Sequence, residues 1–278
     1  MSALGDFLCP PEFSGPRGVR ALSRESSVAL EVARGRRRRA TDRRERATRA
    51  WARAGRLPVS EPVLLVPGFM AGDWSLTRMA SFLRDNGFRT YRSGINVNAG
   101  CTLRSAEQLE SRLESIAVRR GAPVTIVGHS LGGMLARGIA ARRPDLVAGI
   151  VTMGSPVLAP GAVHQLLGWN AELLTRLNRI GLGNLLGSDC VSGACARESW
   201  EAATAPLDPG VGFTAIYSQR DGIVDWRSCL DPAAEPVEVG SSHVGMAFDP
   251  AVFDAVLGAL HDQRVARVER AAEVAEVG

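Results

Sequence analysis

The sequence predicts an α/β protein built on a mostly parallel, doubly wound sheet, and three observations point to this fold class. Short apolar runs recur along the chain, segments with helical spacing separate them, and glycine or proline closes most of these segments. Strands that alternate with helices form parallel sheets whose faces the helices cover. With 278 residues and 45% hydrophobic residues, the chain has the size and apolar content of one globular domain.

The predicted strands are short, continuous apolar runs, which is the pattern of strands buried on both faces. They cover residues 63–66, 88–91, 124–127, 147–153, 213–217 and 237–239. Helical spacing predicts helices over residues 76–86, 102–120, 131–143 and 252–265. Residues 58–265 therefore form the predicted body of the protein, and residues 266–278 form a C-terminal tail.

One long segment interrupts this alternation. Residues 157–212 contain apolar helical stretches and glycine-rich loops but no clear strand. A segment of this length is too long for a plain connection between two strands. We therefore expect it to form a helical cap or lid over the carboxyl end of the sheet.

The N-terminal segment, residues 1–57, is predicted to be a basic helical arm. Between positions 17 and 56 it carries fourteen arginines against four acidic residues. Helical patterns cover residues 23–33 and 41–54, with Gly35 and the run Arg36–Arg39 between them, and Gly55 and Pro58 end the second helix. The first interpretation of this charge is a solvated basic helix pair that folds on the body, and the alternative is contact with an anionic membrane surface. Only Trp51 lies among these charges, so we expect no nucleic acid partner.

The five cysteines indicate reduced thiols, because their number is odd. Cys190 and Cys195 are close enough in sequence to form a disulfide. They lack the second cysteine pair or the nearby histidine of a zinc site, so we expect no metal and no cofactor. The chain shows no signal-peptide pattern and no run of about 20 apolar residues. We expect a cytoplasmic protein that is peripheral at a membrane if the arm binds lipid. The sequence gives no signal for an oligomeric state.

The segment Gly128-His129-Ser130-Leu131-Gly132 lies directly between a predicted strand and a predicted helix. So sharp a turn holds its central residue in strained backbone geometry, and side chains two positions before and after it would collide. The following helix directs its N–H groups and the positive end of its dipole toward Ser130. Ser130 is therefore predicted to be a nucleophile. The alternative is a glycine-rich turn in which Ser130 only caps the helix.

The run from Gly128 to Gly133 resembles the nucleophile elbow of esterases and lipases of the α/β-hydrolase fold family. The resemblance extends over roughly residues 60 to 262, apart from the predicted cap. It implies the α/β-hydrolase fold and a serine hydrolase. In this family the nucleophile is followed along the chain by an acid and then by a histidine.

A serine nucleophile needs a base, and the chain has four histidines. His129 lies inside the elbow, His164 at the start of the predicted cap, and His261 on the last predicted helix. His243 follows the last strand in a loop at the carboxyl end of the sheet, where the family has its catalytic base. We expect His243 to be this base. The alternative is a loop histidine without a catalytic role.

The acid that orients the base is expected after the strand over residues 213–217. Asp221, in Asp221-Gly222-Ile223-Val224, resembles the Asp-Gly-x-Val pattern of the family. Asp225 is the fallback, and its alternative role is that of a surface residue or a helix cap. The order Ser130, Asp221, His243 is the order of the α/β-hydrolase family.

The resemblance also implies an oxyanion hole. One N–H donor would come from Leu131, and the second from the loop after the first strand. Phe69 is the expected residue there, with Met70 as the alternative. Family members commonly have His-Gly where this chain has Pro67-Gly68.

These residues predict an esterase or lipase-like enzyme that cleaves carboxylic esters through an acyl-enzyme on Ser130. Apolar residues at helical spacing between Leu166 and Leu177 either pack the cap or line an acyl pocket, so we expect an ester with an apolar acyl group. An acyltransferase or a thioesterase would use the same triad. A membrane-surface or anion-binding protein that uses the Arg-rich arm is the alternative from another class.

Overall fold

A computed structural model describes residues 6–49, 61–181 and 185–277 of the chain. At its centre lies a six-stranded parallel sheet with the order β2-β1-β3-β4-β5-β6. The strands are β1 Pro62–Val66, β2 Arg89–Arg92, β3 Val124–His129, β4 Val147–Met153, β5 Gly212–Tyr217 and β6 Glu235–Glu238. Each coincides with a predicted strand to within two residues, so the parallel α/β class is confirmed.

The sheet is covered on both faces, which is why its strands are apolar at consecutive positions. In β1, Val63 and Leu65 pack in one hydrophobic cluster, whereas Leu64 and Val66 pack in another on the opposite face. All four side chains are at most 4% exposed. Successive side chains of a strand point to opposite faces, so a strand between two helical layers needs apolar residues throughout.

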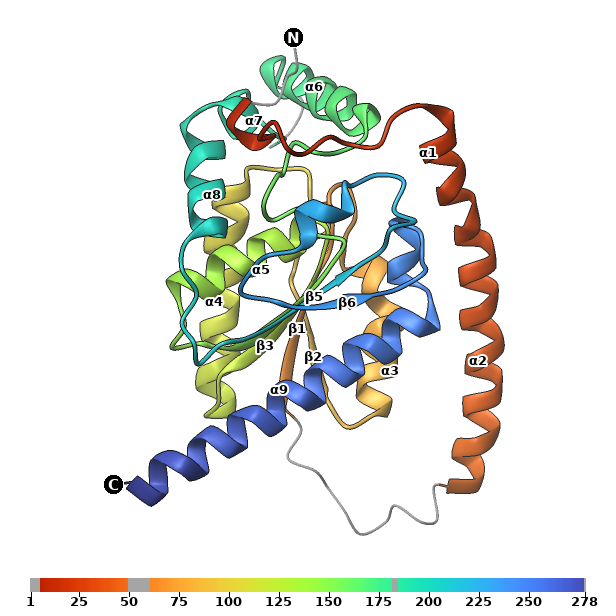
Figure 1. Cartoon of the computed structure of the whole chain (residues 1–278), viewed down its shortest axis with the longest axis vertical. Helices are drawn as coiled ribbons and strands as arrows, with labels where there is room; N and C mark the ends of the chain where they lie inside the picture. Colours follow the sequence, from red (N-terminus) through yellow and green to blue (C-terminus); the bar gives the residue numbers. More distant parts are fainter. Residues whose placement is uncertain (1–5, 50–60, 182–184, 278) are drawn as a thin grey trace.

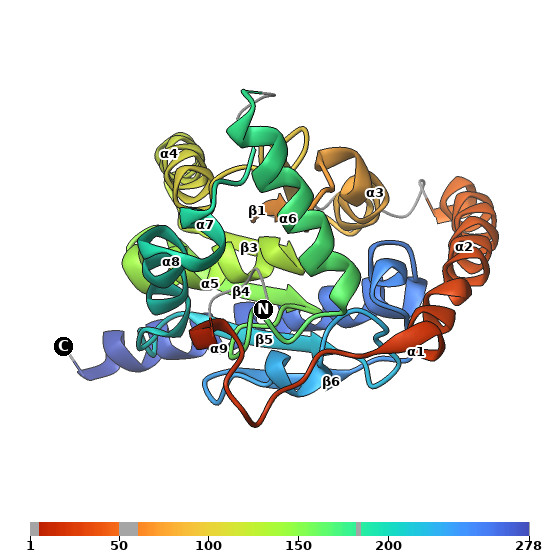
Figure 2. The same ribbon diagram turned by 90° about the horizontal axis from the view of Figure 1, so that it is seen from above.

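Two helical layers provide this cover (Figures 1 and 2). On one face lie α3 Thr77–Asp85 and α9 Pro250–Val277, which contribute to the same cluster as Val63. On the other lie α4 Thr102–Arg120, α5 Leu131–Arg142 and α8 Ala194–Thr204, with α8 packed against α5 and α4.

The strand order creates a crevice at the carboxyl ends of β1 and β3. The chain passes from β1 to β2 on one side and then returns to place β3 on the other side of β1. In open α/β sheets, ligands bind where the strand order reverses in this way. The loop that contains Phe69 follows β1, and Ser130 follows β3, so both residues lie at this crevice.

The segment predicted as a cap divides into two parts. The helices α6 Gln165–Arg179 and α7 Asp189–Ser192 lie above the carboxyl ends of the strands (Figure 1). Helix α8 instead packs beside α5 in the layer that covers the sheet. The span 157–212 is therefore cap only in its first part, because α8 buries its apolar side against the body.

The arm differs from its prediction. After α1 Gly18–Arg24 and a short 3-10 turn, a single helix α2 runs from Val28 to Arg49, straight through Gly35, where two helices were expected. A Cβ atom at Gly35 would lie 2.8 Å from the carbonyl oxygen of Phe248, so glycine allows close packing on the body rather than ending the helix. The predicted helix end with Trp51, Gly55 and Pro58 lies outside the described residues.

The predicted C-terminal tail also differs from the structure, because α9 continues from Pro250 to Val277. Arg267 extends this helix's contacts with the body, since its Nη2 lies 3.0 Å from Glu61 Oε1. Residues 266–277 therefore prolong the last helix. Within the three described ranges, no helix has the length and apolar character needed to cross a membrane.

Candidate active site

Ser130 lies in the sharp turn between β3 and α5 and has φ 52° and ψ −122°. This backbone conformation is costly for a non-glycine residue and persists only where the surroundings enforce it. A Cβ atom at Gly128 would lie 2.5 Å from the Gly132 carbonyl oxygen, and one at Gly132 would lie 2.3 Å from that of Val66. The glycine spacing is thus required by packing, and the turn exposes the Ser130 side chain to the crevice.

Asp221 and His243 meet although they belong to different loops. His243 Nδ1 lies 2.6 Å from Asp221 Oδ2, and both side chains are buried. The other carboxylate oxygen, Oδ1, accepts hydrogen bonds from the N–H groups of Ile223 at 2.8 Å and Val224 at 2.7 Å. These bonds fix the rotation of the carboxylate, so Asp221 can orient the imidazole of His243.

Asp225, the fallback acid, is engaged elsewhere. Its Oδ2 accepts hydrogen bonds from Arg227 Nη2 at 2.6 Å and from the backbone N–H of Ser14 in the arm at 3.1 Å. Burial would raise the pKa of this carboxyl, but the hydrogen bonds from Arg227 and Ser14 and the charge of Arg227 outweigh burial and lower the pKa. The structure therefore brings Asp221 to His243 and pairs Asp225 with Arg227 and the arm.

The electrostatics of His243 favour a base that can accept and hold a proton. Burial opposes its charged form, but the charge of Asp221, the hydrogen bond to it and the charge of Glu25 outweigh burial and raise the pKa of His243. His129 differs, because burial and the neighbouring His243 lower its pKa to about 3. His129 Nε2 lies 3.0 Å from the carbonyl oxygen of His243, so this neutral ring supports the His243 loop.

The two other histidines have structural contacts. Nδ1 of His164 accepts a hydrogen bond from the Leu166 N–H at 3.2 Å and so caps helix α6. The ring of His261 lies edge-on to Phe88, with ring centroids 5.4 Å apart. His243 thus lines one cavity together with Ser130 and also has a carboxylate partner, Asp221.

The loop after β1 offers one candidate oxyanion donor. The Met70 N–H donates a hydrogen bond to the Asn98 carbonyl oxygen at 2.9 Å. Phe69 lines the same two cavities as Ser130, so its N–H is the candidate donor. Asn98 also donates its own N–H to Ala71 O at 2.8 Å, and its Nδ2 to Pro67 O at 2.9 Å. Two donated hydrogen bonds and one accepted hydrogen bond of this buried residue fix the loop, although no motif in the sequence marked Asn98.

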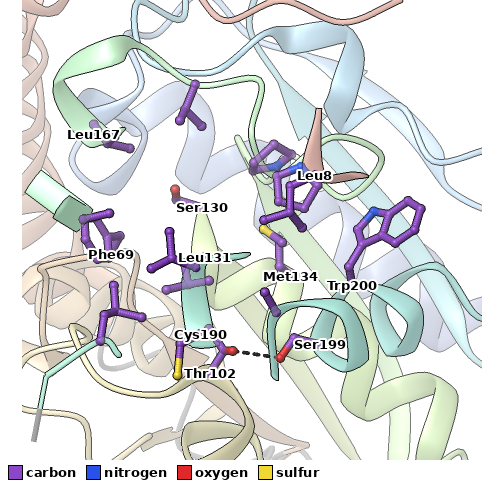
Figure 3. Close-up of a pocket in the computed structure, with 17 residues that line it drawn as sticks. Leu8, Phe69, Thr102, Ser130, Leu131, Met134, Leu167, Cys190, Ser199 and Trp200 are labelled. Atoms are coloured by element: carbon purple, nitrogen blue, oxygen red, sulfur yellow. Dashed lines mark hydrogen bonds between the residues drawn. The ribbon is translucent and has the colours of Figure 1, made fainter. Parts of the chain in front are cut away.

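Two cavities meet at Ser130. One of about 280 Å³ is lined by His243, Met70, Trp74 and Val244. The other, of about 150 Å³, extends under the cap and is predominantly apolar (Figure 3). Its wall includes Leu8, Phe69, Leu131, Met134, Leu167, Cys190 and Trp200. Ser130 thus lies between a cavity that contains the base and an apolar cavity.

Leu8 belongs to the arm, which lies outside the predicted body of the protein. Its side chain is 6% exposed and lines the apolar cavity, and its carbonyl oxygen accepts a hydrogen bond from the N–H of Gly161 at 2.6 Å. The arm also reaches the loop of His243, because Glu25 Oε1 accepts a hydrogen bond from the N–H of His243 at 3.0 Å. No local pattern in an Arg-rich segment marks these residues, since their partners lie more than 150 residues away in the sequence.

Parts of the chain are similar to known proteins. A sequence model described as "alpha/beta hydrolase fold" matches residues 119–190, which contain β3, the Ser130 turn and α5. A triacylglycerol lipase of Vibrio cholerae is 32% identical over 112 residues, which are 38% of this chain and 35% of that protein. A triacylglycerol lipase of Pseudarthrobacter phenanthrenivorans is 33% identical over 106 residues, 34% of this chain and 33% of that protein. The chain thus spans about a third of the length of these relatives.

Among solved structures, the mature form of a lipase from Bacillus licheniformis has the same fold. It superimposes with a TM-score of 0.57 at 14% identity, and the match covers 73% of this chain and 92% of that one. At this identity the likeness concerns the fold.

Proposed function

We propose that this chain, which belongs to the α/β-hydrolase fold family, is a serine hydrolase that cleaves carboxylic esters. One observation carries the proposal: the strained Ser130 turn and the Asp221–His243 pair, at 2.6 Å, come together around one cavity. A serine, a histidine and a carboxylate in this relation are the components of nucleophilic acyl transfer. The similarity to triacylglycerol lipases over 112 and 106 residues supports an ester as the substrate.

In the proposed mechanism, His243 Nε2 takes the proton of the Ser130 hydroxyl as its oxygen attacks the ester carbonyl. Asp221, bonded to Nδ1, holds the tautomer and stabilises the imidazolium. The N–H groups of Leu131 and Phe69 stabilise the oxyanion. His243 then protonates the departing alcohol, and water attacks the acyl-enzyme by the same route.

The two cavities suggest how the ester lies. The alcohol takes its proton from His243, which lines the 280 Å³ cavity, so the alcohol portion occupies that side. The acyl group then occupies the apolar 150 Å³ cavity under the cap. A cavity of this size holds a molecule as large as benzene, so an acyl chain of roughly six carbons fits.

Hydrolysis of p-nitrophenyl esters from acetate to palmitate, compared between wild type and Ser130→Ala, tests the proposal. We expect turnover that peaks near the butyrate to octanoate esters and is lost in Ser130→Ala. If a fluorophosphonate labels Ser130 but no ester is hydrolysed, the acyltransferase or thioesterase alternative replaces ester hydrolysis. If neither reaction occurs, the triad assignment is refuted.

The arm supports a second, peripheral role at the cytoplasmic face of an anionic membrane. Arg34 and Arg36 are exposed on α2, and Trp74 and Trp169 expose 67% and 58% of their surface at the rim of the site and on the cap. Deleting residues 1–56 would also remove Leu8 and Glu25 from the site, so charge removal is the cleaner test. We expect binding to phosphatidylglycerol vesicles that weakens with salt and in the Arg34→Gln/Arg36→Gln variant. Equal binding by the variant would refute an electrostatic role of these arginines.

A further inference from the structure

Three cysteines that are distant in sequence come together below the apolar cavity. Cys101 precedes α4, Cys190 lies in α7, and Cys195 lies in the first turn of α8. Cys195 Sγ lies 3.4 Å from Cys101 Sγ and 3.5 Å from Cys190 Sγ, and all three sulfurs lie within 4.8 Å of one another. From the sequence we expected no metal at Cys190 and Cys195, because no second cysteine pair or nearby histidine follows them. The fold supplies this ligand from position 101.

The arrangement has the dimensions of a three-thiolate metal site. Zinc–sulfur bonds of about 2.3 Å place the sulfurs of one ion roughly 3.7–4.0 Å apart, close to the separations observed. A disulfide would require about 2.05 Å, and all three residues are free thiols. Within the described part of the chain, no fourth histidine, cysteine or carboxylate joins the group, so a trigonal site or one completed by water results.

The surroundings prepare one thiolate and hold the ligands in place. Burial opposes ionisation of Cys101, but the N–H groups of Arg104 and Leu103 and the neighbouring thiols outweigh it and lower the pKa of Cys101. Burial and the neighbouring thiols raise the pKa of Cys195 to about 12. The Leu186 N–H donates to Ala99 O at 2.9 Å, and this contact ties the segment before α7 to the segment before Cys101. An ion would bind the thiolate forms and displace the protons that the thiols carry.

We propose that Cys101, Cys190 and Cys195 form a binding site for one thiophilic metal ion of the Zn²⁺ or Cu⁺ class. Cys190 also lines the apolar cavity, and Thr102 Oγ1 and Ser199 Oγ lie 2.7 Å apart in the same wall (Figure 3). The ion would join α7 and α8 to the start of α4 and so fix one wall of this cavity.

Titration of the reduced, full-length protein with Cd²⁺ under anaerobic conditions tests the site, with the sulfur-to-cadmium charge-transfer absorption as the readout. We expect one ion per chain, proton release on binding, and loss of the band in Cys101→Ser, Cys190→Ser and Cys195→Ser. Cys9→Ser and Cys229→Ser are matched controls outside the cluster and should retain it. Circular dichroism identifies any serine variant that fails to fold, and a cysteine-to-alanine variant at the same position is then used in its place.

No band in the reduced wild type would overturn the proposal, as would equal loss in the two controls. If air-exposed protein loses the mass of two hydrogens, as when a disulfide forms, and the reduced protein takes up no Cd²⁺, two of the cysteines form a redox pair instead. The readout does not depend on ester hydrolysis, so this proposal and the proposed function fail separately.

One acidic residue of the arm, Glu25, contacts two loops of the proposed active site. Glu25 accepts three backbone hydrogen bonds from the loops of the proposed acid and base: Oε1 accepts from Gly222 at 2.9 Å and His243 at 3.0 Å, and Oε2 from Val244 at 3.0 Å. Gly222 directly follows Asp221. A single carboxylate of the arm therefore links the loop of Asp221 to the loop of His243.

Glu31, six residues further along the chain in α2, extends this contact. It is 2% exposed, and its carboxylate accepts hydrogen bonds from the N–H of Ser242 at 2.9 Å and the Ser242 hydroxyl at 2.8 Å. A Cβ atom at Gly245 would lie 1.6 Å from Glu31 Oε2, so the His243 loop is shaped to receive the arm. Hydrogen bonds to ionised carboxylates are roughly twice as strong as neutral ones, which makes the two glutamates firm anchors.

We infer that Glu25 is a positioning residue for the Asp221–His243 pair, an inference that rests on the proposed function. It holds the backbone of both loops, and its charge, like that of Asp221, favours the protonated imidazole, whose ring centroid lies 5.0 Å from that of His129. A displacement of catalytic groups by about 1 Å can cost 10²-fold in rate.

The test compares Glu25→Gln with Glu12→Gln, an exposed glutamate of the same arm. Because the charge near His243 is lost, we expect the acid limb of the kcat/KM profile to shift to lower pH in Glu25→Gln. We also expect kcat to fall about 10-fold or more with KM changed less than about twofold. Glu25→Asp should restore part of the pH shift, and Glu12→Gln should behave as wild type.

An unchanged pH profile and kcat in Glu25→Gln would refute the positioning role. The rate of Ser130 labelling by a fluorophosphonate separates the two proposals. If the wild type is labelled and Glu25→Gln is labelled equally fast, only the positioning role fails; if the wild type is not labelled, the proposed function fails first.

Discussion

His243 Nδ1 and Asp221 Oδ2 lie 2.6 Å apart, and the backbone N–H groups of Ile223 and Val224 hold the second oxygen of the same carboxylate. The carboxylate therefore has one orientation available, with Oδ2 directed at the imidazole. This relationship separates the two acids that the sequence offered. Asp225 bonds Arg227 and the arm, so it can support the loop without orienting the base.

Replacing Asp221 by Asn should reduce kcat for a p-nitrophenyl ester by roughly 10²–10⁴-fold, because an amide leaves the imidazole in the wrong tautomer. Asp225→Asn should reduce kcat far less and act mainly on stability. Steady-state kinetics of both purified variants, with circular dichroism to verify folding, measure the difference. A larger loss of kcat in Asp225→Asn would reverse the assignment of the acid.

The raised pKa of His243 predicts that the acid limb of the pH–activity profile has its midpoint above the ordinary histidine value of about 6.5. The reason is that the base must be neutral to accept the Ser130 proton. The effect on stability has the opposite sign. The favourable protonation of folded His243 is fully present below about pH 6.5 and is lost as the pH rises through the raised folded-state pKa. Activity should therefore increase in the pH window where this contribution to the unfolding free energy decreases.

His129 acts in the other direction, because its folded-state pKa is lowered to about 3. The unfolded chain binds this proton more readily, so stability is lost as the pH falls from about 6.5 toward 3. Melting temperatures across this range should decline more steeply in the wild type than in His129→Gln, provided that the variant folds. Parallel curves would show that His129 does not titrate as the structure indicates.

Gly132→Ala should prevent folding or strongly destabilise the protein, because the added Cβ atom would lie 2.3 Å from Val66 O. The matched control is Gly168→Ala in α6, where nothing lies within 4 Å of the added atom. This control should be neutral or more stable by up to about 1 kcal/mol, since alanine favours a helix. Thermal unfolding of the two variants decides the matter, and similar melting temperatures would contradict the packing argument.

The buried ion pair of Arg137 and Asp231, with Nε and Oδ2 3.0 Å apart, ties α5 to the loop before β6. Asp231→Ala would leave the guanidinium buried without its partner and should cost about 3–5 kcal/mol of unfolding free energy. Arg143 and Asp145 form an exposed pair, so Asp145→Ala should change stability little. Urea unfolding measures both, and a small effect of Asp231→Ala would mean that water reaches Arg137.

The sequence by itself determined the features that depend on local geometry. Continuous apolar runs predict strands buried on both faces, and the spacing of Gly128, Ser130 and Gly132 predicts the turn, because both patterns act over a few residues. The chain order of Ser130, Asp221 and His243 follows the family that these motifs resemble. Gly35 shows the limit of local reasoning: the pattern predicts a break, but packing on Phe248 keeps the helix continuous.

The tertiary structure alone decided which distant groups meet. The Glu25 carboxylate bonds the N–H of His243, 218 residues away, and Cys101 reaches Cys195, 94 residues away. The family pattern favours Asp221 over Asp225, but whether Asp221 bonds His243 depends on which way each carboxylate turns after the strand. Such contacts are fixed by how the helices pack on the sheet, and no pattern within a sequence window contains that packing.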